Sequence, residues 1–195
     1  MAANASSAWD DWSWKLREAV DRIKNSYDHI GRGTGAPFLA IVYPPDAEAS
    51  VDKEWNALLG SFGPEYQITS ISILDLSSKV LEELGIENVI ETMLDPMPGS
   101  NPETELGNLW LSEVVKTIQQ ATEEKLAGKQ IIVLYQLAAL YPATNPRSLM
   151  QALWDTSEVK LNGPVVIFIP GRLLEPRVYE FLNVQRELMY RGDIL

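Results

Sequence analysis

Two short, almost wholly apolar runs in the C-terminal third constrain the fold of this chain more than any other feature. They cover residues 130–135 and 165–169, and helix-like sequence lies between them. Strands of a parallel sheet have this composition, because crossover helices cover both faces of the sheet. Further strands are predicted over 37–43 and 66–74. The pattern predicts a Rossmann-like α/β fold, a three-layer αβα sandwich with a mostly parallel sheet of four or five strands.

Helical periodicity between these strands completes the arrangement. An N-terminal helix within residues 1–30, capped by Asp10 or Asp11, is expected to pack on a single domain that covers residues 1–195. The other predicted elements are helices over 46–62, 77–84, 105–126 and 147–154, one or two helical turns towards Leu94, a short helix over 177–183 and an edge strand over 188–190. Residues 95–104 contain three prolines and are expected to form an exposed loop.

The charge balance and the lack of cysteine disfavour several classes of protein. The net charge is −11, from 27 acidic and 16 basic side chains. Nucleic-acid binding depends mainly on Lys and Arg, so we expect no direct nucleic-acid contact by the isolated chain. Without cysteine there is no disulfide, thiolate zinc site or cysteine nucleophile. No secretory signal and no apolar run of the ~20 residues that a membrane span needs is present, so we expect a cytoplasmic protein that does not bind membranes.

Nucleotide hydrolysis is not favoured by the sequence. Asp75 follows an apolar strand, as a magnesium-binding aspartate does, but no P-loop accompanies it. The nearest match, Gly128-Lys129-Gln130, precedes a strand, and so do the glycines of residues 31–35, whereas phosphate-binding glycines follow a strand and open a helix. Asp75 is therefore interpreted as a helix cap.

The sequence also contains no recognisable catalytic or metal-binding motif. His29 is the single histidine, which is too few for an ordinary zinc site, and no Gly-x-Ser-x-Gly elbow presents a serine nucleophile. We therefore expect no catalytic residues, no cofactor and no metal. The remaining enzyme hypothesis is a metal ion bound by carboxylates such as those of Asp46 and Asp75.

Three tryptophans in one short window of the N-terminal helix are the first candidates for partner binding. They are Trp9, Trp12 and Trp14. Large aromatic rings bury much area, so they either anchor the helix to its own domain or contact another protein. Both interpretations remain open at the level of sequence.

Arginines in the last quarter of this acidic chain are the second group of candidates. Arg147 begins a helix, Arg172 follows Pro170-Gly171, which is expected to end the last buried strand in a tight turn, and Arg191 lies near the C-terminus. An anion or an acidic partner could bind these side chains, because a guanidinium group matches carboxylate and phosphate geometry. Solvation and internal ion pairs are the alternatives.

The edge formed by the carboxyl ends of the strands is the third candidate region. In open α/β sheets, ligands bind beyond these ends. The residues predicted at this edge are Tyr43, Pro44, Asp46, Asp75, Gln136, Tyr141, Pro170, Gly171 and Arg172. A degenerate or unconventional nucleotide-binding domain that uses this edge is the alternative to a protein-binding role.

A pattern of short motifs runs through the last third of the chain. Leu137-Ala-Ala-Leu-Tyr-Pro142 is followed by Arg147-Ser148-Leu149 at a helix start, by the run 163–171 and by Tyr190-Arg191. In these segments the chain resembles the BrxB family of BREX (bacteriophage exclusion) defence systems. It departs from that family at Ile169-Pro-Gly-Arg172, where an aromatic and an acidic residue are usual.

The resemblance implies a small, cytoplasmic, non-enzymatic accessory or scaffold protein of a bacterial anti-phage system. Its expected partners are other BREX components, such as the PglZ phosphatase-like protein. The family supplies no catalytic residues to transfer. This expectation agrees with an acidic α/β domain in which no catalytic motif is found.

Overall fold

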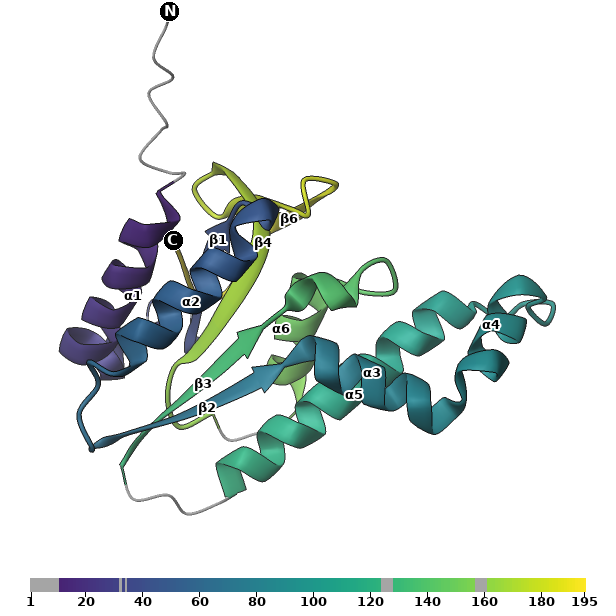
Figure 1. Cartoon of the computed structure of the whole chain (residues 1–195), viewed down its shortest axis with the longest axis horizontal. Helices are drawn as coiled ribbons and strands as arrows, with labels where there is room; N and C mark the ends of the chain where they lie inside the picture. The colour runs from purple at the N-terminus through teal and green to yellow at the C-terminus, as the bar shows by residue number, and fades with distance from the viewer. Residues whose placement is uncertain (1–10, 32, 34, 124–127, 157–160) are drawn as a thin grey trace, which may run out of the picture.

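The computed structural model describes residues 11–31, 33, 35–123, 128–156 and 161–195. In chain order the elements, with η for a turn of 3-10 helix, are α1 (Trp12–Ser26), η1 (Tyr27–His29), β1 (Phe38–Tyr43), η2 (Pro45–Ala47), α2 (Glu48–Leu59), β2 (Tyr66–Ser72), α3 (Ile73–Leu84), α4 (Ile86–Leu94), α5 (Pro102–Glu123), β3 (Lys129–Tyr135), η3 (Leu137–Leu140), α6 (Pro146–Asp155), β4 (Val165–Glu175), β5 (Val178–Phe181), β6 (Gln185–Leu188) and β7 (Asp193–Ile194). Figure 1 shows them arranged around one central sheet.

The strands within the described residues form a single seven-stranded sheet. Five of these described strands pair in parallel, in the order β2-β3-β4-β1-β7. The other two, β5 and β6, pair antiparallel with the far part of β4 and with each other. The prediction of an α/β fold with a mostly parallel sheet between helices is confirmed.

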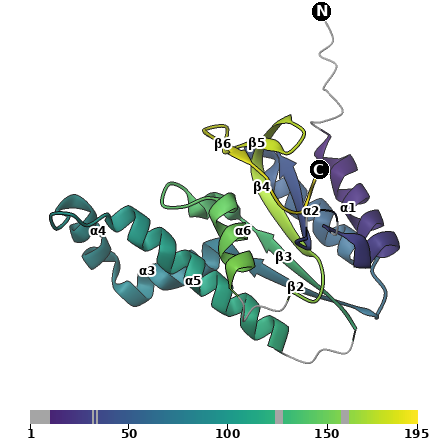
Figure 2. The same ribbon diagram turned by 180° about the vertical axis from the view of Figure 1, so that it is seen from behind.

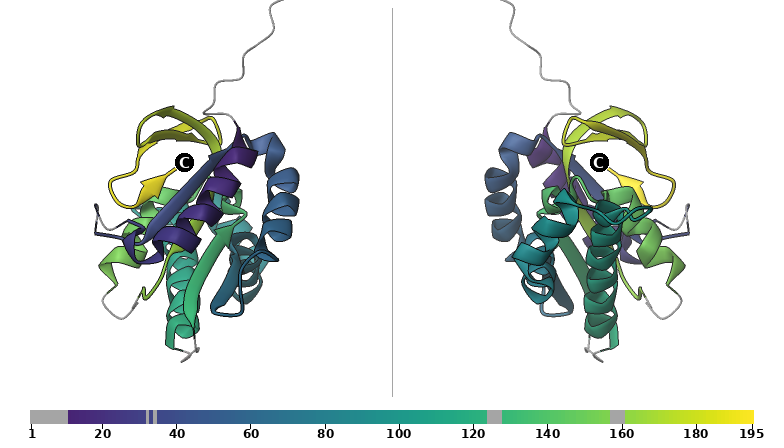
Figure 3. Two further views of the ribbon diagram at one scale, coloured as in Figure 1. Left: turned by 90° about the vertical axis from the view of Figure 1, so that its left-hand side faces the viewer. Right: turned by 90° about the vertical axis from the view of Figure 1, so that its right-hand side faces the viewer.

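Alternating side chains of the central strands pack into two separate cores. Phe38, Ala40 and Val42 of β1 face a core that α5 and α6 cover. Leu39 and Ile41 of the same strand face the core that α1 and α2 cover. Figure 2 shows α6 against the sheet from behind, and Figure 3 shows α1 and α2 on the side of the sheet opposite α6. This burial of both strand faces explains the apolar runs in the sequence.

Side-chain caps determine where two of the helices begin. The Asp11 carboxylate accepts the backbone N–H of Trp14 at 2.9 Å, so Asp11 caps α1, while Asp10 lies outside the described residues. At the start of α3, the Ser72 hydroxyl accepts the N–H of Asp75 at 3.0 Å. The prediction that Asp75 is the cap is therefore wrong. Asp75 lies in the first turn instead, where a negative charge is favoured by the helix dipole.

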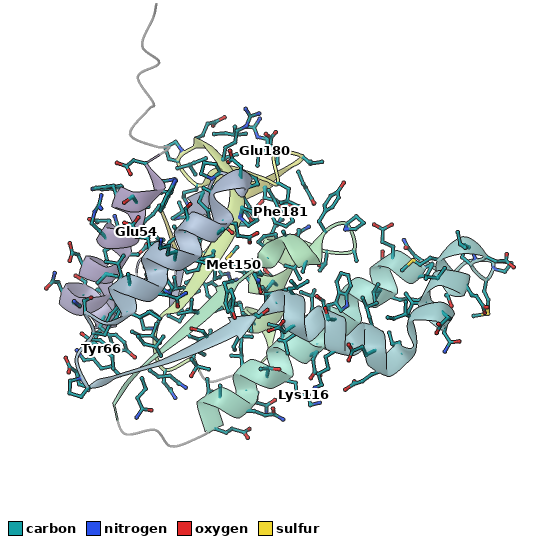
Figure 4. All side chains as sticks on the ribbon, in the orientation of Figure 1. Glu54, Tyr66, Lys116, Met150, Glu180 and Phe181 are labelled. Carbon is teal, nitrogen blue, oxygen red and sulfur yellow. The ribbon has the colours of Figure 1, made fainter. Side chains whose placement is uncertain are left out.

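The last long strand differs from its prediction, because Pro170-Gly171 does not end it. β4 pairs with β1 as far as Pro170 and with β5 from Gly171 onward, and it runs to Glu175. Proline cannot donate to a ladder, so it is tolerated at this change of partner. Gly171 lies against the carbonyl group of Glu180, which Figure 4 labels beyond the end of the parallel sheet.

The helix predicted over 177–183 is also wrong, because this segment forms β5 and the turn after it. Tyr179 and Phe181 are buried while the residues beside them are partly exposed, which is the period of two expected for a strand. Leu182 and Asn183 have positive φ and form the turn to β6. The edge strand is Gln185–Leu188 rather than 188–190.

The helices between β2 and β3 begin earlier than predicted. The helix predicted from residue 77 begins at Ile73, and the long helix predicted from residue 105 begins at Pro102. The predicted end of the long helix, at residue 126, lies outside the described residues. In the described ranges, no helix combines the length and the apolar composition that crossing a membrane requires.

We expect Gly171→Ala to lower the free energy of unfolding by about 1–3 kcal/mol, because an added Cβ would collide with the Glu180 carbonyl oxygen across the β4–β5 pair. Denaturant unfolding measures the loss. Gly33→Ala is the matched control, since nothing lies within 4 Å of a Cβ built at Gly33. Equal stability of the two variants would contradict the assigned pairing.

Candidate docking surfaces

Helices α3, α4 and α5 form an arm that projects from the carboxyl end of β2, as Figure 1 shows. Near the sheet, α5 contributes Leu111, Val114 and Ile118 to the core. Farther out, Val80, Leu106 and Trp110 form a small apolar cluster of their own. Helix α4, at the far end, has no buried residue. The arm is therefore anchored at its base and increasingly exposed towards its tip.

The far end of this arm exposes an unusual number of large apolar side chains. We define the arm surface as Leu84, Ile86, Ile90, Leu94, Met97 and Leu109. Leu94 alone leaves 81% of its surface exposed. A cavity of about 210 Å³ opens between α4 and α5, where Val89, Met93 and Leu106 line it. Large apolar side chains exposed close together in a fold are one mark of a site that interacts with other proteins.

The charge around the arm surface has a single sign. Residues 80–112 contain seven acidic side chains and no Lys, Arg or His. Lys79, the basic residue that directly precedes this stretch in the sequence, donates a hydrogen bond to the carboxylate of Glu113 at 2.6 Å. That hydrogen bond raises the pKa of Lys79 and lowers the pKa of Glu113. The arm surface is thus apolar with an acidic rim, and a partner needs apolar and basic groups.

Two of the three predicted arginines meet at one cleft. The guanidinium carbon of Arg147 lies 4.9 Å from the ring centre of Tyr190, and that of Arg191 lies 4.4 Å from the ring centre of Trp154. Both arginines line a small cleft together with Gln151. Stacking on aromatic rings holds the guanidinium planes and leaves their edges available for hydrogen bonds. We call this group the arginine cleft.

A buried carboxylate lies beside the arginine cleft. Glu187 is only 6% exposed, and its carboxylate lies 3.8 Å from Arg147 and accepts a hydrogen bond from Gln185 at 2.8 Å. Burial raises the pKa of Glu187, and Arg147 and Gln185 offset part of this increase. The hydroxyl of Tyr179, on the paired strand, is buried and has no hydrogen-bond partner among the residues that the structure describes. The pairing of β5 with β6, which the sequence did not predict, brings these groups together.

Arg172, the third arginine that the sequence suggests for partner binding, lies outside the arginine cleft. Arg172 pairs with Glu180 across the β4–β5 ladder, with nitrogen–oxygen distances of 2.7 Å. This internal ion pair is one of the alternatives that the sequence left open for these arginines. Arg172 does not line the cleft that Arg147 and Arg191 share. Its role in partner binding stays a prediction.

The structure describes two of the three tryptophans near the N-terminus, and their environments differ. Trp12 is partly buried and packs against the core under α1 and α2. Trp14 is 47% exposed. Trp9 lies outside the described residues. Trp12 thus anchors the helix, whereas Trp14 is free to contact a partner.

The strand-end edge is partly closed by contacts within the chain. The buried Tyr43 hydroxyl donates to the Glu48 carboxylate at 3.0 Å, and the Ser72 hydroxyl donates to the Gln136 side-chain oxygen at 2.6 Å. Asp46 and Asp75 follow β1 and β2, which are third neighbours in the sheet. Strands about 4.8 Å apart place them about 14 Å from each other, too far to bind one metal ion. Among the described residues, no group of three metal-ligating side chains occurs.

A pocket near the strand-end edge is relevant to the alternative hypothesis that this edge binds a nucleotide. It has a volume of about 110 Å³ and lies between α2 and the sheet, with Asp52 in its wall. Pockets for nucleotide-sized ligands have volumes of about 300 Å³ or more, and a carboxylate repels phosphate. Nucleotide binding at this edge stays a prediction without an observation that favours it.

Comparisons with known proteins identify no family for this chain, so the functional site has to be argued from its geometry. No protein-family model, no curated protein and no solved structure matches the chain. The arm surface was missed at the level of sequence, although two of its signals were present. Ile86, Ile90 and Leu94 recur every four residues, and the long stretch without a basic residue surrounds them.

We expect Glu187→Gln to change the pH dependence of stability. Because the pKa of Glu187 is raised above its ordinary value of 4.5, the folded state binds more protons than the unfolded state just above that pH. The free energy of unfolding of the wild type should therefore fall, relative to the variant, as the pH rises from 4.5. Urea unfolding at several pH values measures this difference. A difference that does not change with pH would show that the carboxylate is not perturbed.

Proposed function

We propose that this protein is a non-enzymatic accessory or scaffold component of a bacterial anti-phage system of the BREX type, and that it acts in the cytoplasm by binding other proteins. The resemblance of the C-terminal third to the BrxB family supplies the biological setting. The arm surface supplies the physical argument for protein binding. The proposed partners are other BREX components, including the PglZ phosphatase-like protein.

The observation that carries the proposal is α4, a helix without a fully buried residue. Ile86, Ile90 and Leu94 leave 53%, 52% and 81% of their surface exposed, although Val89 and Met93 of the same helix pack partly against the small apolar cluster. Exposing apolar area to water costs about 25 cal/mol per Å², so burying it against a partner is favourable by the same amount. A helix with this pattern of apolar residues is typical of a docking element.

The acidic residues around the arm surface indicate which kind of partner segment binds there. Seven acidic side chains without a basic one surround the apolar residues, so a neutral or acidic partner would meet repulsion. A segment with an apolar face and flanking Lys or Arg satisfies both features. The proposed occupant is therefore a basic amphipathic helix of a partner protein. Opposite charges also speed the encounter at low salt.

A designed peptide tests the chemistry of this surface. We expect a helical peptide of Leu and Lys, with leucines on one face, to bind the wild type and to bind more weakly as salt increases. The combined change Ile86→Ser, Ile90→Ser and Leu94→Ser should weaken binding about 10-fold or more, because these side chains supply the apolar contact. Isothermal titration calorimetry measures both effects.

Controls separate docking from adhesion of any cationic peptide. Val184→Ser removes an exposed apolar side chain outside the arm and should leave binding unchanged. A peptide of the same composition with its leucines scattered around the helix should bind poorly. Equal binding of the two peptides, or equal binding by the triple variant, would reject the arm as the docking surface.

The biological setting requires a separate test. When the tagged chain is expressed with its neighbouring genes, we expect the wild type to retain a PglZ phosphatase-like protein and the triple arm variant to lose it. Protection against phage should be lost in parallel, while Val184→Ser retains both. Purification of the wild type alone, with no defence protein bound, would contradict the accessory role.

A further inference from the structure

The cavity between α4 and α5 lies in the arm, which Figure 2 shows extending away from the sheet. Its walls come from one face of each helix and from Leu84 at the end of α3. The lining residues of α5 recur at helical spacing, and they are Pro102, Glu105, Leu106 and Leu109. Those of α4 are Asn88, Val89, Thr92 and Met93. We call this cavity the arm pocket.

The arm pocket adjoins the arm surface. Leu84 and Leu109 belong to both, and they leave 40% and 46% of their surface exposed. On α4, Ile90 of the arm surface lies beside Met93 of the pocket, because residues three apart are neighbours on a helix. A segment docked on the arm surface can therefore reach the pocket with one of its side chains.

Two polar side chains of the pocket wall are bonded to their own helix. The Asn88 amide donates to the carbonyl of Leu84 at 3.1 Å, and the Thr92 hydroxyl donates to the carbonyl of Asn88 at 2.8 Å. Leu, Val, Met and Pro side chains supply most of the remaining wall. The arm pocket therefore offers mainly apolar contact, which suits an apolar group of the partner.

The volume of the arm pocket fits one aromatic ring. An apolar cavity of about 150 Å³ holds a benzene molecule, and the arm pocket has about 210 Å³. A leucine side chain would leave more of this space empty, and unfilled space forfeits van der Waals contact. Met93 in the wall favours a ring further, because sulfur makes favourable contacts with aromatic rings.

The charged group of the pocket wall is the carboxylate of Glu105. Glu105 is exposed, and it forms no ion pair with any residue in the described ranges. A Lys or Arg beside the aromatic residue of a partner segment can pair with it. Charge pairs at the rim of an interface contribute to specificity and to the rate of encounter.

We propose that the arm pocket receives a single aromatic side chain of the partner segment, and that a Lys or Arg of the same segment pairs with Glu105. This rests on the docking function proposed for the arm surface and names the residue that anchors the partner. Aromatic anchors in well-packed pockets carry much of the binding energy of an interface. The anchor also fixes the position of the basic amphipathic helix along α4, which contact with the arm surface alone does not.

Phenylalanine-containing versions of the Leu and Lys peptide test the anchor. In each version a different leucine of the apolar face is replaced by Phe. We expect one version to bind the wild type about 10-fold more tightly than the all-leucine peptide, because its ring fills the pocket. Isothermal titration calorimetry measures the Kd. The ring should also shift the methyl signal of Met93 in nuclear magnetic resonance spectra, and Met93→Leu identifies that signal by removing it.

A ring built into the protein closes the pocket. Thr92→Phe should abolish the preference for the Phe peptide, while continued binding of the all-leucine peptide shows that the arm remains folded. Thr104→Phe is the matched control, because Thr104 is exposed on α5 and does not line the pocket. This control should keep the preference.

The carboxylate at the pocket has its own test. Glu105→Gln should weaken binding of the Phe peptide about 3-fold or more beyond the effect of Glu103→Gln. Both substitutions remove one exposed acidic group from α5, but only Glu105 lines the pocket. Equal effects of the two substitutions would overturn the pairing with Glu105.

The outcomes separate the anchor from the docking function. The anchor is wrong, and the docking function stands, if the all-leucine peptide binds but no Phe peptide binds more tightly. A preference for Phe that survives Thr92→Phe, or a Met93 signal that the Phe peptide leaves in place, overturns the anchor as well. If no peptide binds the wild type, the docking function and the anchor both fail.

Discussion

Burial of residues 165–169, the first half of β4, on all sides organises the rest of this protein. The first six residues of β4 pair with β1 on one edge, and three of them also pair with β3 on the other. The side chains of residues 165–169 fill the cores on both faces. Each fully buried Val, Ile or Phe contributes roughly 1.5–3 kcal/mol relative to an exposed one. A strand buried in this way cannot slip in register, because a shift by one residue would exchange the two cores.

The same strand also shapes the C-terminal surface. Because β4 continues past Pro170 and Gly171, it leaves the parallel sheet and becomes the base for β5 and β6. This antiparallel extension brings Glu187 to the start of α6, where it meets Arg147. The arginine cleft therefore results from a change of strand partner. Pro170 and Gly171 permit that change through a missing N–H and a missing Cβ.

The arm is a place where the chain does not complete its own packing. Val89 and Met93 of α4 pack partly against the small apolar cluster, but Ile86, Ile90 and Leu94 stay exposed in a stretch rich in acidic side chains. This exposure costs stability, and we propose that binding of a partner compensates for it. The large core between the helix layers supplies the stability that the arm requires.

The sequence by itself determined the layered α/β fold, because strands buried on both faces must be apolar throughout and helices must alternate with them. It also limited the cap of α1 to Asp10 or Asp11, since capping depends on a residue and its immediate neighbours, and the structure shows Asp11 in this role. Only the tertiary structure decided that Pro170-Gly171 continues a strand, that 178–181 is β5, and that Arg147 meets Arg191 while Arg172 pairs with Glu180. These outcomes depend on partners that are distant in sequence, or on a strand that pairs with both a parallel and an antiparallel neighbour. Local propensity carries no information about such partners.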